Sequence, residues 1–508
     1  MSPHPQGLGV RGLTVRFGTK TALDDVAFHV APGEIVAVIG ENGAGKTTLL
    51  RVVSGFLRPS AGDVLIDGVP AALRGPRAAS ARGVGMVHQH FLLIPELTVA
   101  ENVVLGREPG AGPLLDLAAA AEEIRACAER FGLDVDPHAR VADLDVAAQQ
   151  RVELLKVLVR GARFLLLDEP TGLLPPASVR DLFALMERLA AEGCGVVLVT
   201  HRLREVFAVC TRATVLRHGH VVGDETLAGT DQATLARMMI GDDLVAEDTL
   251  ADTPSGARET LLHVKDLTVA GRGERAAVER VSFEIASGEV VGLAGVAGSG
   301  QRELFDAIAG VRPAVHGSIR LAGTVLDDLG VAERRRAGLG YVPEDRLDDG
   351  LVGALTVEEN LVLGASPERG FDSGPWLIRD RVRAEAAEVV TSHDVRPPDP
   401  GLLAGALSGG NQQKVLLARE MRAKPTVLLA AEPARGLDFR ATASVHARLR
   451  HLATTGHGVF VSGTDLPELL EICDRILVMF SGRIAGEVLP GETDEEQIGL
   501  LMSGGGVA

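Results

Sequence analysis

The chain has 508 residues, a length that predicts about two to four domains. Apolar residues make up 46% and charged residues 23% of the sequence, which excludes a disordered chain, and the glycines have no three-residue period, which excludes collagen. The formal net charge of −17 argues against a general nucleic-acid-binding protein, because that class needs a basic surface.

Cysteine spacing and apolar runs restrict the class further. The cysteines form no C-x-x-C pair, so neither a zinc site nor a disulfide framework is expected, and a reducing compartment fits. No apolar run approaches the roughly 20 residues of a membrane span, and residues 1–11 lack the pattern of a secretory signal. The sequence therefore predicts a soluble intracellular protein or the soluble subunit of a larger assembly.

The first predicted strand and helix flank a phosphate-binding loop. A β-branched run at 34–39 predicts a strand, and GENGAGKT at 40–47 satisfies G-x-x-x-x-G-K-[ST] before a predicted helix. In this pattern backbone amides surround a phosphate, Lys46 contacts the β- and γ-phosphate oxygens, and the Thr47 hydroxyl is a ligand for Mg²⁺. The residues expected to bind the nucleotide are Gly40, Glu41, Asn42, Gly43, Ala44, Gly45, Lys46, Thr47 and Thr48.

Two residues outside the loop are candidates for the same site. Phe17 is expected to stack on adenine, with a place in the hydrophobic core as the alternative. Gln89 follows another predicted strand, where its amide can reach a metal ion and the attacking water. The alanine-rich, helical pattern at 115–160 then predicts a helical subdomain inserted into the sheet domain.

Two further apolar runs predict strands that end beside polar residues. FLLLD at 164–168 ends on Asp168, and GVVLVT at 195–200 ends before His201. Strands that are apolar throughout are typical of a parallel sheet covered on both faces, so the predicted fold class is α/β with a mostly parallel sheet. Beside the loop, we expect Asp168 to hold Mg²⁺, Glu169 to act as general base and His201 to sense the γ-phosphate. Taken alone, each has a purely structural alternative.

The second half of the chain repeats the first. LTVAEN at 97–102 recurs as LTVEEN at 355–360, and LDVAAQQR at 144–151 recurs as LSGGNQQK at 407–414. A period of about 260 residues is too long for a solenoid and indicates two homologous domains. We expect a first domain at 1–241, an acidic linker at 242–259, a second domain at 260–503 and a tail at 504–508.

Together these residues resemble the ATP-binding subunits of ABC transporters over nearly the whole chain. In that family, residues 40–47 look like the Walker A loop and 164–169 like the Walker B strand with its catalytic glutamate. Gln89 looks like the Q-loop residue and a third ligand of Mg²⁺, and His201 looks like the H-loop residue. The resemblance implies two tandem P-loop ATPase domains that use ATP and Mg²⁺.

The second half carries the motif that completes this resemblance. LSGGNQQ at 407–413 resembles the family's signature motif, with Asn411 where the usual pattern has Gln, and Asp438 fits the D-loop. The tandem arrangement and YVPEDR at 341–346 resemble the fused subunits of bacterial monosaccharide and nucleoside importers. The segment 85–105 is closer to the nucleoside branch, which is served by a lipoprotein binding protein, although the cargo itself is left open.

The resemblance also implies partners and a location. Family members of this type bind two integral-membrane permease subunits and work with an extracytoplasmic substrate-binding protein or lipoprotein. They need no nucleic acid and lie at the cytoplasmic face of the cell membrane as peripheral subunits. The residues just after Gln89 are the expected permease contacts.

In the family, two such domains close head-to-tail, and each ATP lies between the Walker motifs of one and the signature of the other. Site one would join the first-half Walker motifs to Ser408, Gly409, Gly410, Asn411 and Asp438, and every part is present. Site two is degenerate. The residues that replace the usual ones in site two are Gln301, Arg302, Ala431 and Thr464 in the second half and Asp145, Ala147 and Pro175 in the first. The sequence thus predicts one competent and one degenerate ATP site in a head-to-tail dimer formed by one chain.

Other tandem ABC proteins offer alternatives. Those that act on ribosomes usually carry a longer charged linker and keep both sites. DNA-repair members carry cysteine-rich zinc insertions, which this sequence lacks. A non-catalytic scaffold disagrees with a complete site one. The ribosomal class is the main alternative, and co-purification with permeases or with ribosomes separates the two.

Overall fold

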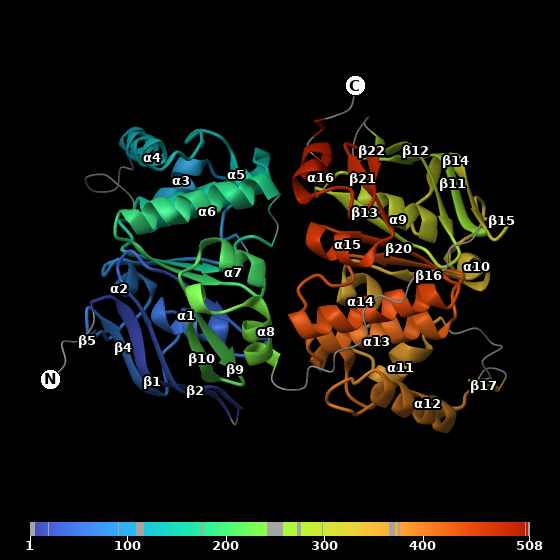
Figure 1. Cartoon of the computed structure of the whole chain (residues 1–508), viewed down its shortest axis with the longest axis horizontal. Coiled ribbons are helices and arrows are strands. Elements are labelled where there is room, and N and C mark those ends of the chain that lie inside the picture. Colours follow the sequence, from blue (N-terminus) through green and yellow to red (C-terminus); the bar gives the residue numbers. More distant parts are fainter. Residues whose placement is uncertain are drawn as a thin grey trace. The chain divides into compact units, whose positions relative to one another are not determined.

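The computed structural model describes residues 6–18, 20–89, 91–107, 116–172, 174, 176–240, 258–271, 276–296, 298–364, 371–373, 376–502 and 504–505. The chain divides into two compact units, Met1–Val245 and Ala246–Ala508 (Figure 1). The linker expected at 242–259 lies outside the described residues except for 258–259. Pro175 and residues 506–508 of the expected tail lie outside them as well.

The first unit contains an antiparallel sheet and a mostly parallel sheet. The antiparallel strands lie in the order β2-β1-β4-β5. The second sheet has the order β10-β9-β3-β8-β7-β6, in which all neighbours are parallel except β9 and β10. These strands are β1 Leu8–Phe17, β2 Lys20–Val30, β3 Ile35–Ile39, β4 Ala61–Ile66, β5 Val69–Pro70, β6 Val84–Val87, β7 Phe164–Asp168, β8 Gly195–Val199, β9 Arg212–Arg217 and β10 His220–Thr226.

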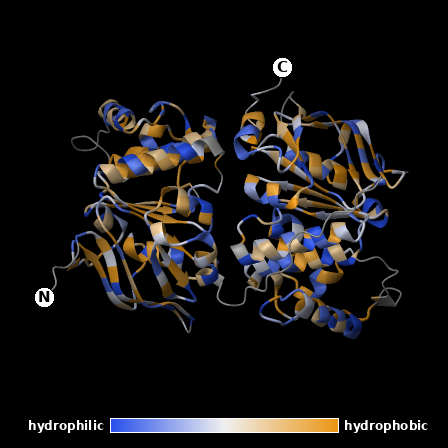
Figure 2. Ribbon diagram, viewed as in Figure 1, coloured by the Kyte–Doolittle hydropathy of each residue, from blue (hydrophilic) through white to orange (hydrophobic). Residues whose placement is uncertain are grey.

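The central strands of this sheet position the candidate site. Every residue of β3, β7 and β8 is buried, and Figure 2 shows hydrophobic residues along the central strands. Burial on both faces explains why these runs are apolar throughout. Because neighbouring parallel strands end at the same edge of a sheet, the loops after β3, β7 and β8 come together there.

Helices surround the sheet and form the predicted insertion. Side chains from α3, α4 and α5 share one small core, made of Val99, Ala100, Val103, Ile124, Ala128, Val152 and Leu155. This cluster is the helical subdomain expected from the pattern at 115–160, extended by α3. The helices are α1 Lys46–Val53, α2 Pro76–Ser80, α3 Val99–Val104, α4 Leu117–Phe131, α5 Val146–Leu158, α6 Pro176–Ala191, α7 Leu203–Val209 and α8 Gln232–Ile240, with 3₁₀ turns at Val141–Asp143 and Leu227–Gly229.

The second unit has the same topology. Its large sheet has the order β16-β19-β20-β13-β21-β22, which matches β6-β7-β8-β3-β9-β10 strand by strand, and its antiparallel sheet has the order β12-β11-β14-β15. The strands are β11 Thr260–Ala270, β12 Ala276–Ala286, β13 Val290–Gly295, β14 Ala314–Leu321, β15 Thr324–Val325, β16 Leu339–Val342, β17 Asp372–Ser373, β18 Trp376–Leu377, β19 Val427–Ala431, β20 Gly458–Gly463, β21 Arg475–Phe480 and β22 Arg483–Val488. The structure confirms the α/β fold and the internal repeat.

The helices of the second unit also follow the first. They are α9 Gln301–Ala309, α10 Val331–Arg336, α11 Val357–Val362, α12 Arg379–Ser392, α13 Gly409–Arg422, α14 Phe439–Thr454, α15 Leu466–Ile472 and α16 Glu495–Met502, with a π-helical turn at Arg346–Gly350 and a 3₁₀ turn at Ala404–Ala406. None of the helices in the described part of the chain has the length and hydropathy that crossing a membrane requires.

Candidate nucleotide sites

The loop between β3 and α1 has the shape of a phosphate cradle. Gly40 has a φ of 152° and Gly45 a φ of 109°, both in the region that favours glycine. A Cβ atom added at Gly40 would lie 2.1 Å from the carbonyl oxygen of Leu216, and one at Gly45 would lie 2.5 Å from Cδ2 of Leu23. The positive φ and the neighbouring residues therefore both favour glycine at these two positions.

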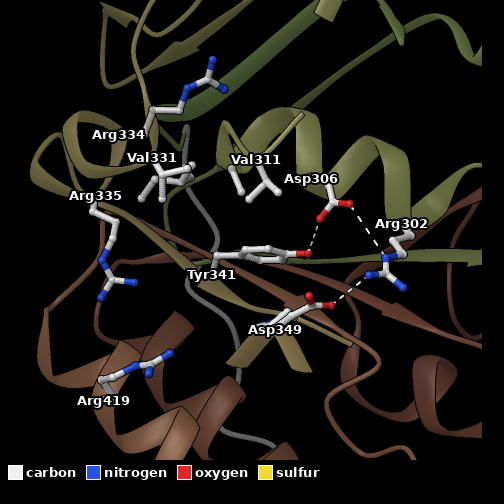
Figure 3. Close-up of a pocket in the computed structure, with 12 residues that line it drawn as sticks. Arg302, Asp306, Val311, Val331, Arg334, Arg335, Tyr341, Asp349 and Arg419 are labelled. Carbon is white, nitrogen blue, oxygen red and sulfur yellow. Dashed lines mark hydrogen bonds and ion pairs between the residues drawn. The ribbon is translucent and has the colours of Figure 1, made fainter. Parts of the chain in front are cut away.

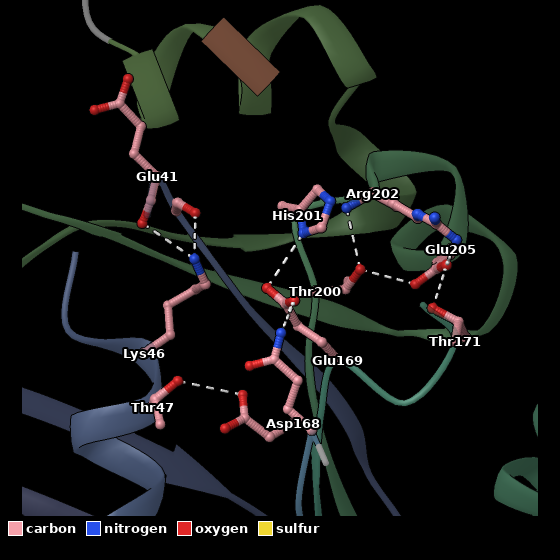
Figure 4. Close-up of polar contacts among 12 residues, drawn as sticks. Glu41, Lys46, Thr47, Asp168, Glu169, Thr171, Thr200, His201, Arg202 and Glu205 are labelled. Atoms are coloured by element: carbon pink, nitrogen blue, oxygen red, sulfur yellow. Dashed lines mark hydrogen bonds and ion pairs between the residues drawn. The ribbon is translucent and has the colours of Figure 1, made fainter. Parts of the chain in front are cut away.

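Lys46 begins α1 and lies inside the curl. Its Nζ atom donates to the carbonyl oxygen of Gly40 at 2.6 Å and to that of Glu41 at 3.1 Å (Figure 4). The rest of the loop places Asn42 and Gly43 at the surface, Ala44 in the core, and Thr48 half-buried on α1. A glycine cradle with an ammonium inside it and a helix N-terminus behind it fits a polyphosphate.

Thr47 and Asp168 supply two oxygen atoms beside the cradle. The Thr47 hydroxyl donates to Oδ1 of Asp168 at 3.4 Å (Figure 4). Asp168 is the buried last residue of β7, and burial together with the nearby charge of Glu169 raises the pKa of its carboxyl above the usual value. Hydroxyl and carboxylate oxygens are the ligand types that Mg²⁺ prefers, so this pair fits that ion.

Glu169 receives two polar side chains from other loops. Nε2 of Gln89 donates to its Oε2 at 2.9 Å, and Nδ1 of His201 lies 3.2 Å from its Oε1. Burial alone would raise the pKa of Glu169, but the hydrogen bond and charge of His201, aided by Lys46, hold that pKa below its usual value. The structure thus brings two predicted residues, Gln89 and His201, to the carboxylate of a third, Glu169, which is ionised at neutral pH.

A buried network behind His201 was not predicted. Glu205, on the first turn of α7, accepts a hydrogen bond from the Thr171 hydroxyl at 2.6 Å and another from the Thr200 hydroxyl at 2.8 Å (Figure 4). It therefore joins the loop after Glu169 to the residue that precedes His201. Its partners lie 34 and 5 positions away, and no sequence period relates them, so only the fold reveals the contact.

Phe17 ends β1, and 52% of its surface is exposed. This exposure excludes the core alternative for its ring. A flat ring at the surface is suited to stacking on a base.

The second unit keeps the cradle but changes its chemistry. Gly298 and Gly300 have φ values of 86° and 106°, close to the 84° and 109° of Gly43 and Gly45. Gln301, which stands where the first unit has lysine, donates from Nε2 to the carbonyl oxygen of Val296 at 3.2 Å. An amide therefore replaces an ammonium just after two glycines with nearly the same φ values.

Arg302, in the position of Thr47, is paired within its own unit. Its guanidinium lies 2.9 Å from the carboxylate of Asp349 and 3.9 Å from that of Asp306. Asp306 also accepts a hydrogen bond from the Tyr341 hydroxyl at 2.9 Å. Figure 3 shows these side chains around a cavity of about 230 Å³. The two carboxylates offset the charge that Arg302 brings to this region.

Glu432 has the backbone conformation of Glu169 in a different environment. Their φ values are 46° and 48°. The position of Asp168 is occupied by Ala431, and Thr464 is the hydroxyl partner of Glu432, at 3.5 Å. Burial raises the pKa of Glu432 to about 7, although Arg435 acts to lower it. The carboxyl is therefore partly protonated at neutral pH.

The two signature positions differ at the start of their helices. In the first unit, Oδ1 of Asp145 accepts a hydrogen bond from the backbone N–H of Ala148 at 2.7 Å and so caps α5. In the second unit, the Ser408 side chain forms no capping bond to α13, and its Oγ accepts instead from Nδ2 of Asn411 at 2.9 Å. A carboxylate thus occupies the amino end of α5, whereas Ser408, at the matching position of α13, carries a hydroxyl.

Asp438 has a structural partner of its own. It precedes α14, and its Oδ1 accepts from the backbone N–H of Ala441 at 2.9 Å. This is an N-cap, worth about 1 kcal/mol in typical helices. The D-loop role expected from the sequence remains a prediction.

Comparison with known proteins gives the family. Residues 23–172 and 278–435 match the family described as ABC transporter. The ribose import ATP-binding protein RbsA 1 of Rubrobacter xylanophilus is 42% identical, over 98% of this chain and 98% of its own. The nucleoside import ATP-binding protein NupA of Lactococcus lactis is 39% identical, over 97% of each chain. The guanosine import ATP-binding protein NupO of Bacillus subtilis is 38% identical, over 95% of this chain and 94% of its own.

A solved structure shares the fold over both units. The archaeal ribosome recycling factor, solved with an archaeal ribosomal stalk protein, has a TM-score of 0.61 at 21% identity and covers 92% of this chain and 87% of its own. At this identity the likeness concerns the fold alone. The two matched regions and the full-length relatives show that the chain belongs to the ABC transporter family, as an ATPase with two ABC domains in tandem.

Proposed function

We propose that this chain is the ATP-hydrolysing, energy-coupling subunit of an ABC importer for nucleosides or simple sugars, with one competent and one degenerate ATP site. The observation that carries the proposal is the group around Glu169, which Gln89 and His201 contact beside the Thr47–Asp168 pair. In the second unit, the positions of Thr47, Asp168 and His201 are occupied by Arg302, Ala431 and Thr464. The relatives named above are import proteins for ribose, nucleosides and guanosine, which supports import as the process.

Hydrolysis follows from the residues of site one. The cradle and Lys46 bind the β- and γ-phosphates, and Phe17 stacks on the adenine. Thr47, Asp168 and Gln89 would hold Mg²⁺, which neutralises phosphate charge when it is bound. Glu169 accepts a proton from the water that attacks the γ-phosphorus, while the bond to the ADP oxygen breaks.

The second half would complete this site in a head-to-tail arrangement. Ser408, Gly409 and Gly410 supply a hydroxyl and backbone amides at the amino end of α13, where the helix dipole favours a phosphate. The proposed site also includes Asn411 and Asp438. The pattern of losses supports the arrangement, because the intact motifs all fall in one composite site and the altered ones in the other.

The other composite site would hydrolyse ATP slowly or not at all. It would lack the lysine, the metal-binding threonine and aspartate, and the histidine. Asp145 would also place a carboxylate where a phosphate needs donors, since that carboxylate already caps α5. The preserved glycine cradle supports nucleotide binding without turnover there.

The proposed partners are two integral-membrane permeases and an extracytoplasmic substrate-binding protein or lipoprotein, with the chain at the cytoplasmic face of the membrane. Leu92 and Ile94, just after Gln89, are 57% and 39% exposed. The backbone of Leu92 is held by Glu153 and Lys156, so its apolar side chain is presented at a fixed place. Exposed apolar residues on a fixed loop suit a protein contact.

The test is ATP-dependent uptake by the chain reconstituted with its permeases and binding protein. We expect cargo uptake to require all the components, and the chain to co-purify with membranes that contain the permeases. Co-purification with ribosomes instead would favour the ribosomal alternative, which at present has only a likeness of fold.

A further inference from the structure

Asn411 stands where the family's usual pattern has glutamine, and both ends of its amide are engaged. Nδ2 lies 2.9 Å from Oγ of Ser408, and Oδ1 lies 2.8 Å from the backbone nitrogen of Arg396. A backbone N–H can only donate, so the Arg396 contact requires the amide oxygen on that side. The amide NH₂ must then face Ser408, which settles the orientation of the side chain.

This orientation determines what the Ser408 hydroxyl can do. An amide NH₂ donates and cannot accept, so Oγ of Ser408 is the acceptor in this bond. The hydroxyl proton must therefore point away from Asn411. Ser408 is exposed and forms no capping bond to α13, so its proton is available to an anion at the amino end of that helix.

We propose that Asn411 is a positioning residue that fixes the Ser408 hydroxyl as a hydrogen-bond donor to the γ-phosphate. This inference rests on the proposed composite site, in which Ser408 meets ATP bound by the first half. Without Asn411, the hydroxyl rotates among its staggered positions, and part of its preorganisation is lost. The first half has Ala148 at the matching position, so its signature has no side chain that could act in this way.

The anchor on Arg396 explains why the amide can hold the hydroxyl. Arg396 lies in the loop between α12 and α13, and Asp394 in the same loop is paired with Lys414 at 3.2 Å. The loop is thus attached to α13 at two points, the Asn411 amide and the Lys414 ammonium. An amide fixed at its oxygen end has little freedom to turn away from Ser408.

A double-mutant cycle in the assembled transporter tests the inference. The variants are Ser408→Ala, Asn411→Ala and the two combined. Asn411→Ala is expected to lower kcat about fivefold to tenfold, as for one lost hydrogen bond, with KM for ATP nearly unchanged. The double variant is expected to turn over at the rate of Ser408→Ala alone, because Asn411 has no hydroxyl left to orient.

The variant Asn411→Asp distinguishes the loss of the hydrogen bond to Ser408 from a structural effect on the loop. Its carboxylate still accepts from the Arg396 N–H, so the loop keeps its anchor and the thermal unfolding temperature is expected to stay near that of the wild type. It cannot donate to Ser408 and draws the hydroxyl proton toward itself, so kcat should fall at least as far as in Asn411→Ala.

The outcomes separate the two proposals. Full turnover by Ser408→Ala would overturn the composite site. If Ser408→Ala is slow and the fold-losses in kcat of the two single variants multiply in the double variant, the two residues act independently. That result would overturn the role of Asn411 and leave the composite site standing. Wild-type turnover by Asn411→Asp would also overturn it.

Discussion

At the scale of single residues, the two glutamates that follow β7 and β19 show how neighbours set function. Glu169 and Glu432 have almost the same φ, 48° and 46°. His201 lowers the pKa of Glu169 against the effect of burial, whereas burial raises the pKa of Glu432 to about 7. A nearly equal φ therefore goes with an ionised carboxylate in the first unit and a partly protonated carboxyl in the second.

Glu169→Gln should retain ATP and lose turnover. The amide keeps the shape of the side chain but cannot take a proton from water. Since general-base catalysis contributes about 10²–10⁴-fold, kcat is expected to fall by that order. ATP turnover and retained nucleotide would be measured with permeases present. Hydrolysis at the wild-type rate would show that Glu169 is not the base.

His201→Ala should change the pH dependence as well as the rate. Removing the imidazole removes the hydrogen bond and charge that lower the pKa of Glu169, and leaves the effect of burial, which raises it. The base works when ionised, so the acidic limb of the kcat/KM profile should move to higher pH. The measurement is a pH–rate profile of the variant beside that of wild type. An acidic limb at an unchanged pH would mean that another group controls it.

At the scale of elements, the sequence predicts what lies in contiguous motifs. The loop at 40–48 and the strand before Asp168 were recognisable because their residues are adjacent in sequence. The contact of Thr171 with Glu205 joins a loop to a helix 34 residues later, and the nearer partner of Arg302, Asp349, lies in the π-helical turn Arg346–Gly350. No sequence period predicts either contact. Sequence therefore indicated the candidate reacting groups, while the fold revealed the groups that hold or neutralise them.

Ser408→Arg should cripple hydrolysis although the Walker motifs lie in the other half. The amino end of α13 is suited to a phosphate, and a long cation there would block closure over it. Asp145→Asn is the matched control at α5. Asparagine caps a helix as well as aspartate does, so turnover and stability should stay near wild type. Normal ATPase activity of Ser408→Arg in the assembled transporter would contradict the cross-half site.

At the scale of the whole molecule, the two units share one topology but carry different side chains at the matching site positions. The strand orders of the two large sheets match position by position, and Gly298 and Gly300 keep the positive φ of Gly43 and Gly45. Folding thus required the second unit to keep its apolar strands and tight turns. It did not require Lys46, Thr47 or Asp168 to be repeated, because in the proposed site those side chains bind the phosphates and Mg²⁺ and do not build the apolar core. The second unit therefore keeps the fold of the first with different side chains at these positions.

The inequality of the two units should appear in paired substitutions at matching positions. Lys46→Ala removes the ammonium inside the cradle that we propose to be competent, so uptake and ATP turnover should fall to background. Gln301→Ala removes one amide contact to the Val296 carbonyl and no charge, and should leave most of the activity. Arg302 does not alter this expectation, because Asp349 and Asp306 already offset its charge. Both variants would be assayed for cargo uptake and ATP turnover with permeases present. An equal loss of uptake and ATP turnover in the two variants would mean that the second cradle hydrolyses ATP, or that nucleotide bound there is tightly coupled to closure. Either result would overturn the one-site proposal.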